Sequence, residues 1–553
     1  MTLGSEPTNH MSAGEAILRS LIVNGVDTVF GLPGAQTYPL FDALERYAAD
    51  IDTYTVRHEQ AAAYMALGYA KASGRPGVYT VVPGPGMLNT TAALSTAWAT
   101  NAPVLCITGQ IPSAYLGLRR GALHEIPDQL ATMRGLTKWA ARIERVEDAP
   151  DVLREAFRIM RSGRPGPVAV EMCWDRLAET GAAEIGAAAL IDVSPPPDAR
   201  AIARAADLLS AAERPLILLG GGAQHASAEI TALVEKLGAP VAAFRSGRGI
   251  VTEDHPLSVT SYAASQLWKD TDVLLGIGSR LEMPYARWAD MLKAVTVAPS
   301  SPRLIRIDID PDEMTRLKPE IGIVADAADG TRALLTALAS APQAPRSRER
   351  IQRTRADTDA RIATVTPHVE YLAAIRSVLP RDGFFVEELC QAGFASYFAY
   401  PVLSPRTYVT PGFQGTLGFG FPTALGVKAA YPDRAVVSIS GDGGFMFGVQ
   451  DLATAVERNL GVIAIVFNNS AFGNVRRDLT RLYKGNALGS KFRNPDFAKL
   501  ADAFGAGFYR AASPADLMPK LADALARNVP AIIEVPVDPD LEVSPWPFIH
   551  TGG

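Results

Sequence analysis

The stretch from residue 435 to residue 469 constrains the fold of this chain more than any other. It begins with an apolar, β-branched run over 435–440, which is typical of a buried strand. A glycine-rich turn at 441–444 follows, then a helical pattern over 450–459 and a second apolar run over 462–467. The pattern predicts a strand–helix–strand unit, whose two parallel strands end at the same edge of a sheet.

A polar side chain follows each of these two predicted strands. Asp442 follows the first and Asn469 the second, 27 positions later. A carboxylate and an amide oxygen are hard ligands that suit Mg²⁺, whose other positions are usually taken by water and phosphate oxygens. Glycines in the turn let backbone N–H groups approach a phosphate closely. The residues predict a Mg²⁺–diphosphate site, and the alternative is a helix-capping Asp with a turn Asn.

The same alternation of strands and helices continues along almost the whole chain, which predicts α/β domains with parallel sheets. At 553 residues the chain is too long for one core. A proline-rich stretch at 194–197 and a charge-rich one at 341–355 mark two breaks. We therefore predict three doubly wound domains, over 1–190, 195–340 and 360–553. The charged run at 346–350 is expected to be a solvated helix or linker.

The composition argues against several classes of protein. With 53 basic and 58 acidic residues, a general nucleic-acid surface is not expected. The three cysteines have no metal-binding spacing and favour a reducing cytoplasm, and the seven histidines form no zinc motif. Residues 1–13 lack a hydrophobic signal region and the apolar runs have strand length, so no membrane span is expected.

The Gly-Asp-Gly motif, followed after 24 residues by Asn-Asn, resembles the pattern of thiamine diphosphate-dependent enzymes. Three α/β blocks in this order resemble the branch of acetolactate synthases, 2-oxo acid decarboxylases and benzaldehyde lyase, over nearly the whole chain. The resemblance implies pyrimidine-binding, central and diphosphate-binding domains, with thiamine diphosphate and Mg²⁺ as cofactors. It also implies Asp442, Asn469 and the carbonyl of Ala471 as metal ligands.

Two catalytic roles follow from the resemblance. Glu59, in Arg57-His58-Glu59, would hydrogen-bond the aminopyrimidine ring and move a proton, which requires a carboxyl group with a matched pKa. Leu417 would force the cofactor to bend, and the carbonyl of Gly415 would bind its exocyclic nitrogen. The alternatives are a helix N-terminal glutamate and an ordinary core leucine.

Two further residues are candidates on the substrate side. Gln36 lies in a loop that resembles the one facing the reacting carbon, and Ala35-Gln36 is similar to the Ala-His of benzaldehyde lyase. His124 stands where the relatives carry a glutamine that reaches the active site, and an imidazole can move a proton near pH 7. A solvated loop amide and a surface histidine are the alternatives.

The resemblance implies cofactor contacts from several loops: Pro33, Gly34, Glu59, Pro83, Gly86, Asn89, Gln391, Gly415, Leu417, Gly441, Asp442, Gly443, Gly444, Asn469, Ala471, Phe472 and Gly473. Cys390 replaces a usual glycine beside Gln391, which leaves the local contacts open.

The chain also departs from acetolactate synthases. Asn474 and Asp478 are polar where those enzymes carry Met and Trp, so a different acceptor preference is expected. Arg476 or Arg477 could bind a substrate carboxylate, and exposed helix arginines are the alternative. Acetolactate synthases that hold FAD carry a run of acidic and basic residues that is missing here from 276–282. The acidic residues of 308–310 could still contact a ribose. FAD is therefore possible but not favoured.

The leading prediction is thiamine diphosphate- and Mg²⁺-dependent decarboxylation of a 2-oxo acid with carboligation, by a lyase or transferase. The first alternative is cleavage and ligation of 2-hydroxy ketones, as in benzaldehyde lyase, suggested by Ala35-Gln36 and by residues 137–140. The second is a non-catalytic cofactor-binding subunit, against which Glu59 argues. Small 2-oxo acids or acyloins are the expected substrates. A cytoplasmic homodimer or homotetramer with active sites between subunits is the expected assembly.

Overall fold

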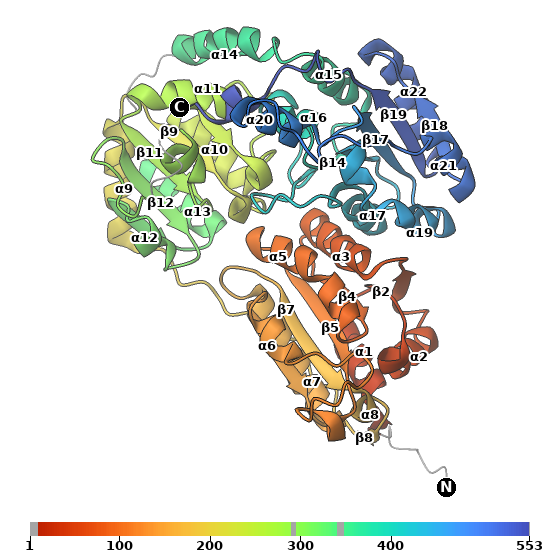
Figure 1. Cartoon of the computed structure of the whole chain (residues 1–553). Coiled ribbons are helices and arrows are strands. Elements are labelled where there is room, and N and C mark those ends of the chain that lie inside the picture. Colours follow the sequence, from red (N-terminus) through yellow and green to blue (C-terminus); the bar gives the residue numbers. More distant parts are fainter. Residues whose placement is uncertain (1–8, 289–294, 340–347, 552–553) are drawn as a thin grey trace. The chain divides into compact units, whose positions relative to one another are not determined.

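The computed structural model describes residues 9–288, 295–339 and 348–551 (Figure 1). It contains three parallel sheets, of six, five and six strands, which confirms the predicted α/β fold class. A small antiparallel pair, β1 (His10–Ser12) with β8 (Thr180–Ala182), accompanies the first sheet. The described residues form two compact units, one with the described parts of 1–193, 411–432 and 448–460, the other with those of 194–410, 433–447 and 461–553.

The first sheet belongs to the first unit, and all its strands are parallel. In spatial order it consists of β3 (Asp52–Thr55), β2 (Thr28–Gly31), β4 (Gly77–Val81), β5 (Val104–Gln110), β7 (Val168–Cys173) and β6 (Trp139–Ile143). Its main helices are α1 (Ala13–Val23), α2 (Tyr38–Arg46), α3 (Glu59–Ser73), α4 (Pro85–Asn89), α5 (Thr91–Ala99), α6 (Gln129–Arg134), α7 (Ala149–Arg161) and α8 (Trp174–Leu177). Strands β4, β5 and β7 are buried along their whole length, as expected for a parallel sheet that helices cover on both faces.

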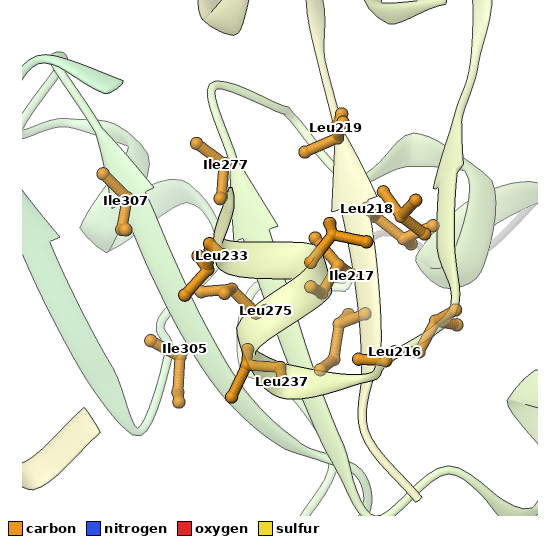
Figure 2. Packing of buried hydrophobic residues seen from close by; sticks show 14 of the residues in the cluster. Leu216, Ile217, Leu218, Leu219, Leu233, Leu237, Leu275, Ile277, Ile305 and Ile307 are labelled. Atoms are coloured by element: carbon orange, nitrogen blue, oxygen red, sulfur yellow. The ribbon is translucent and has the colours of Figure 1, made fainter. Parts of the chain in front are cut away.

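The second unit holds the other two sheets. The central sheet has the order β10 (Val241–Ala243), β9 (Leu216–Leu219), β11 (Val273–Ile277), β12 (Arg303–Asp308) and β13 (Ile321–Val324). Its helices include α9 (Ala199–Ala211), α10 (Ser227–Leu237), α11 (Ser261–Leu267), α12 (Glu313–Arg316) and α13 (Ala327–Leu338). Figure 2 shows how leucines and isoleucines of β9, β11 and β12 meet Leu233 and Leu237 of α10. Each such buried side chain stabilises the fold by roughly 1.5–3 kcal/mol.

The third sheet has the order β15 (Tyr408–Val409), β14 (Phe384–Glu387), β16 (Val436–Gly441), β17 (Val462–Asn468), β19 (Ala531–Pro536) and β18 (Gly507–Arg510). The helices of this region include α15 (His368–Val378), α16 (Gln391–Ala399), α18 (Asp442–Phe445), α20 (Gly473–Leu482), α21 (Phe497–Phe504), α22 (Pro514–Arg527) and α23 (Trp546–Ile549). Helices α17 (Gly420–Ala430) and α19 (Leu452–Glu457) belong to the first unit instead.

Both six-stranded sheets have the same topology. Numbered along the chain, their strands lie in the order second, first, third, fourth, sixth, fifth. The second strand is therefore added on one side of the first strand, and the third strand on the other side. In such folds, ligands bind beyond the carboxyl ends of the first and third strands, where the strand order reverses. In the third sheet these strands are β14 and β16, and β16 is the strand that ends next to Asp442.

The predicted strand–helix–strand unit is present, with a shorter helix than expected. The strands are β16 and β17, and they pair in parallel. The helical pattern over 450–459 forms a 3₁₀ turn at Val449–Asp451 followed by α19. Part of the predicted break at 341–355 lies outside the described residues, and the remainder belongs to α14 (Arg348–Ile362). No helix within the described ranges is long and apolar enough to cross a membrane.

Candidate active site

The loops after β16 and β17 leave the sheet next to each other, because Gly441 pairs with Phe467 in the parallel register. Asp442 is only 1% exposed. Its carboxylate accepts hydrogen bonds from the backbone N–H of Gly443 at 2.9 Å and from Nδ2 of Asn494 at 2.7 Å. The same Asn494 nitrogen donates to Oδ1 of Asn468 at 2.9 Å. Asn494 thus bridges the two loops, a role for which the sequence gives no local signal.

The surroundings of Asp442 favour a cation. Burial raises the pKa of its carboxyl group, and the hydrogen bonds from Asn494 and Gly443 oppose this effect. A buried carboxylate is costly unless an opposite charge compensates it. The ligands predicted on the adjacent loop, the Asn469 amide and the Ala471 carbonyl, also offer oxygen atoms, and within the described ranges no cluster of three or more His, Cys, Asp or Glu side chains could hold a metal. Such an oxygen set fits Mg²⁺ with phosphate and water as its other ligands.

Asn469 is held from two sides. Its Nδ2 donates to Oε2 of Glu542 at 3.0 Å, and its Oδ1 accepts from the backbone N–H of Ala471 at 3.1 Å. A Cβ atom on Gly473 would lie 2.7 Å from Asn469 Nδ2, and one on Gly443 would lie 2.5 Å from the Phe472 ring. The two glycines therefore let the loops pack closely around the expected metal ligands.

The loop after β14 reaches the same sheet edge. Cys390 caps α16, because its Sγ accepts a hydrogen bond from the backbone N–H of Gly393 at 3.2 Å. This contact explains how a cysteine is accommodated at the position that the sequence left open. Gln391, the first residue of α16, is 6% exposed, and its Oε1 has no hydrogen-bond partner among the residues that the structure describes. The unpartnered amide oxygen would accept a hydrogen bond from a donor group of a ligand, while the backbone N–H groups at the start of α16 are the ones that suit an anionic group.

Glu59 lies in the first unit, at the first position of α3. The side chain of His58 caps this helix by accepting from the backbone N–H of Gln60 at 3.2 Å. The Glu59 carboxylate accepts a hydrogen bond from Nδ2 of Asn89 at 3.0 Å. A Cβ atom on Gly86 would lie 3.6 Å from Glu59 Oε1. The structure therefore brings together three predicted residues, Glu59, Gly86 and Asn89.

Asp451 anchors the segment that leads into α3, and sequence reasoning missed it. Its Oδ1 accepts from the backbone N–H of Arg57 at 2.9 Å and from the hydroxyl of Thr454 at 3.0 Å. The side chain is fully buried, and burial raises the pKa of its carboxyl group to about 6. No recognisable motif surrounds Asp451, so only the tertiary contact reveals this role.

Leu417 is half-buried and lies outside the hydrophobic core, so it is not an ordinary core leucine. Its neighbour Thr416 accepts a hydrogen bond from the hydroxyl of Tyr64 on α3 at 2.9 Å. Gly415 and Gly418 adopt left-handed backbone angles, with φ of +61° and +77°. Glycine adopts this conformation without steric cost, which explains why it occupies both positions flanking Thr416 and Leu417. The loop that carries Leu417 is therefore fixed to the same helix that begins with Glu59.

Gln36 and His124 contact each other. Gln36 is 2% exposed, so it is not a solvated loop amide. Its Nε2 donates to the carbonyl of Leu123 at 3.0 Å, and its Oε1 lies 3.0 Å from Nδ1 of His124. A Cβ atom on Gly84, in the loop with Pro83, would lie 2.3 Å from the His124 carbonyl, and one on Gly34, which follows Pro33, would lie 2.3 Å from Val82. The loops predicted to face the substrate thus form one packed group.

The polar residues of α20, which follows the loop after β17, form a hydrogen-bond network with the C-terminal segment. Arg477 donates to Oδ1 of Asn474 at 2.5 Å and to the hydroxyl of Ser544 at 2.7 Å. The indole N–H of Trp546 donates to the same Asn474 oxygen at 2.5 Å. Asp478 lies 3.5 Å from Arg477. Arg477 is therefore committed to contacts within the chain, and it connects α20 to the C-terminal segment.

In the central sheet, the described loops after β9 and β11 pack directly against each other. A Cβ atom on Gly220, after β9, would lie 2.1 Å from the carbonyl oxygen of Gly278, after β11. The predicted ribose contacts are bonded within the chain, since Asp308 accepts from the Asp310 N–H at 3.0 Å and Asp310 lies 2.9 Å from Arg316.

Comparison with known proteins agrees with this geometry. Three family models match the chain in order: the thiamine pyrophosphate enzyme N-terminal binding domain over 11–132, the central domain over 202–335, and the C-terminal binding domain over 390–535. A probable 2-ketoarginine decarboxylase of Pseudomonas aeruginosa is 35% identical over 516 residues, which is 91% of this chain and 90% of the relative.

Two acetolactate synthase large subunits are also similar. A probable one of Methanocaldococcus jannaschii is 33% identical, over 98% of this chain and 94% of the relative. Isozyme 1 of Escherichia coli is 30% identical, over 97% and 95% respectively. Because these matches span nearly the whole chain and include both cofactor-binding domains, the chain belongs to the thiamine pyrophosphate enzyme family.

Proposed function

We propose that this enzyme catalyses thiamine diphosphate- and Mg²⁺-dependent decarboxylation of a 2-oxo acid and transfers the acyl unit to an acceptor. The relatives support this reaction class, because one is named as a decarboxylase and two as acetolactate synthase subunits. The observation that carries the proposal is the Glu59 carboxylate, held by Asn89 beside Gly86 at the start of α3. A subunit that only bound the cofactor would have no need of this group.

Different residues of the chain would bind the metal, bind the diphosphate and transfer the proton. Asp442, Asn469 and the Ala471 carbonyl would hold Mg²⁺, while Gln391 and the loop glycines would bind the diphosphate. When bound, thiamine diphosphate supplies the electron sink that decarboxylation requires. Glu59 holds and returns a proton at its carboxylate. Leu417 would pack against the cofactor and help to orient it.

We propose a cytoplasmic homodimer or homotetramer as the active form. Glu59 and Asp442 belong to different units of the chain. In the proposed assembly, Glu59 of one subunit serves a cofactor held by the partner subunit's Asp442. The three cysteines are free thiols, which agrees with a reducing compartment.

The test is CO₂ release from a panel of 2-oxo acids with thiamine diphosphate and Mg²⁺ supplied. The panel should run from pyruvate through aromatic to guanidino-bearing side chains, and the Glu59→Gln variant is the control. We expect release from one side-chain class and none above background from the variant. If no acid reacts although the cofactor binds, the proposed reaction is wrong.

A second candidate is cleavage and ligation of 2-hydroxy ketones. The contact between Gln36 and His124 favours it, because it fixes an imidazole on a loop predicted to face the substrate. Cleavage of at least one acyloin, lost in His124→Ala, would support this reaction.

For the central domain we propose that no FAD is required, and full activity of flavin-free protein is the expected result.

A further inference from the structure

We infer that Glu542 is a positioning residue for Asn469, an inference that rests on the proposed Mg²⁺ site. Oε2 of Glu542 accepts the hydrogen bond from Nδ2 of Asn469 at 3.0 Å, although 73 positions separate the two residues. An amide binds a cation only through its oxygen, because its nitrogen carries hydrogens. Which end of the Asn469 amide faces the metal therefore decides whether Asn469 is a ligand.

The chemistry of a carboxylate selects one orientation of this amide. An ionised carboxylate accepts hydrogen bonds and donates none. Glu542 therefore stabilises the orientation in which Nδ2 faces it and Oδ1 points away, to the side where the Ala471 N–H lies at 3.1 Å. The reverse orientation would place two acceptor oxygens against each other. Gly473 leaves room for Nδ2, since a Cβ atom there would lie 2.7 Å from it.

Glu542 is itself held in place. Its side chain is 8% exposed, and its Oε1 lies 3.2 Å from Nε2 of the fully buried His368, a close contact that lacks hydrogen-bond geometry. The His368 ring packs against Phe467, two positions before Asn469, with ring centroids 6.3 Å apart. The next residue, Val543, donates its backbone N–H to the Thr366 carbonyl at 3.0 Å. The carboxylate thus has a fixed position, as an outer-shell partner of a metal ligand requires.

The competing explanation is that Glu542 only attaches the C-terminal segment. Ser544 and Trp546 of this segment also contact α20, through Arg477 and Asn474. If attachment were its only role, loss of Glu542 would lower thermal stability and leave the Mg²⁺ affinity unchanged. The two explanations therefore differ in metal binding.

The experiment measures thiamine diphosphate binding to the full-length protein by calorimetry over a series of Mg²⁺ concentrations. We expect Glu542→Ala to raise the apparent Kd for Mg²⁺ by about 10- to 100-fold, with cofactor affinity recovering at excess Mg²⁺. Glu542→Gln keeps an acceptor oxygen but no longer enforces the orientation, so a smaller increase of several-fold is expected. Asp540→Ala is the matched control in the same segment, because the Asp540 side chain is 85% exposed and its carboxylate lies 3.9 Å from the Arg476 guanidinium. This control should leave the Kd for Mg²⁺ unchanged.

An unchanged Mg²⁺ Kd in Glu542→Ala, or in Glu542→Gln if the alanine variant does not fold, would overturn the inference. A second measurement uses an Asn469→Ala background, in which Glu542→Ala should cause no further loss of Mg²⁺ affinity, because its effect passes through Asn469. A full additional loss there would contradict a positioning role. If the wild-type protein bound the cofactor independently of Mg²⁺, the metal site itself would be wrong, and that result is distinct from the others.

Discussion

Glu59 is the single residue whose substitution should separate catalysis from cofactor binding. Glu59→Gln preserves the size of the side chain and an acceptor oxygen for Asn89, but it cannot exchange a proton. We expect kcat for CO₂ release to fall by about 10²- to 10⁴-fold, the usual contribution of general acid–base catalysis. The Kd for thiamine diphosphate should stay within a few-fold of wild type by calorimetry. Wild-type turnover at saturating cofactor would contradict the assignment.

Asp451 should make stability depend on pH. Burial raises the pKa of its carboxyl group from the ordinary 3.8 to about 6, so the folded state binds this proton more tightly than the unfolded state. The contribution of Asp451 to stability is therefore greatest below about pH 4, declines as pH rises to about 6, and stays low above that.

Asp451→Asn keeps the oxygen that accepts from Arg57 and Thr454 and cannot ionise. We expect the variant to be more stable than wild type by about 1–3 kcal/mol at pH 8 and equal to it at pH 4. Denaturant unfolding at the two pH values measures this difference. A gap of the same size at both pH values would show that ionisation is not its cause.

The sequence predicted some of the site residues and not others, for a physical reason. Asp442 and Asn469 each follow an apolar strand, and Glu59 begins a helix within a motif, so local pattern alone predicts where they lie. Glu542 and Asn494 reach Asn469 and Asp442, in the loops after β17 and β16, from distant parts of the chain. Their roles depend on tertiary approach, which leaves no local pattern.

At the scale of elements, the packing of α3 against α17 depends on glycine. A Cβ atom on Gly426 of α17 would lie 1.9 Å from the carbonyl oxygen of Met65, and one on Gly68 of α3 would lie 2.1 Å from that of Thr423. Both clashes are with backbone, which cannot move aside alone. The helices are therefore in direct backbone contact, and they connect Glu59 to the loop of Leu417.

Gly426→Ala should force these helices apart. We expect a loss of about 1–3 kcal/mol in the free energy of unfolding, as for other overpacked contacts, together with a lower kcat. Gly135→Ala is the matched control in the first unit, because the nearest atom to its Cβ would be 3.5 Å away. Urea unfolding and CO₂ release measure the two effects. Equal stability of the two variants would show that the contact tolerates a methyl group.

The elements themselves were largely predictable, whereas their arrangement was not. Apolar runs and glycine turns predicted β16, β17 and parallel sheets in three blocks. The strand order of the sheets and the membership of 411–432 in the first unit follow from long-range packing. The close contact of Gly68 and Gly426 has no signature in either helix when its sequence is considered alone.

At the scale of the whole molecule, one topology occurs twice and the two copies carry different groups. The domain with the first sheet contains Glu59, Gly86 and Asn89, and the domain with the third sheet contains the proposed metal ligands and the loops proposed to bind the diphosphate. The group around Glu59 includes none of the proposed metal ligands, and the group around Asp442 does not include Glu59. We propose that a complete site requires both sets, and that the proposed dimer would bring them together from two subunits.

This arrangement predicts complementation between two inactive variants. In a mixed dimer of Glu59→Gln and Asp442→Ala chains, one site carries both substitutions and the other carries neither. Random pairing makes about half of the dimers mixed, so about a quarter of all sites should be intact. Co-expressed chains should therefore recover about a quarter of wild-type CO₂ release, while each variant expressed alone stays inactive. Mixed dimers isolated with two different tags should recover about half. If the isolated mixed dimers were inactive, Glu59 and Asp442 would have to act within one chain, because only then does every site contain a substitution.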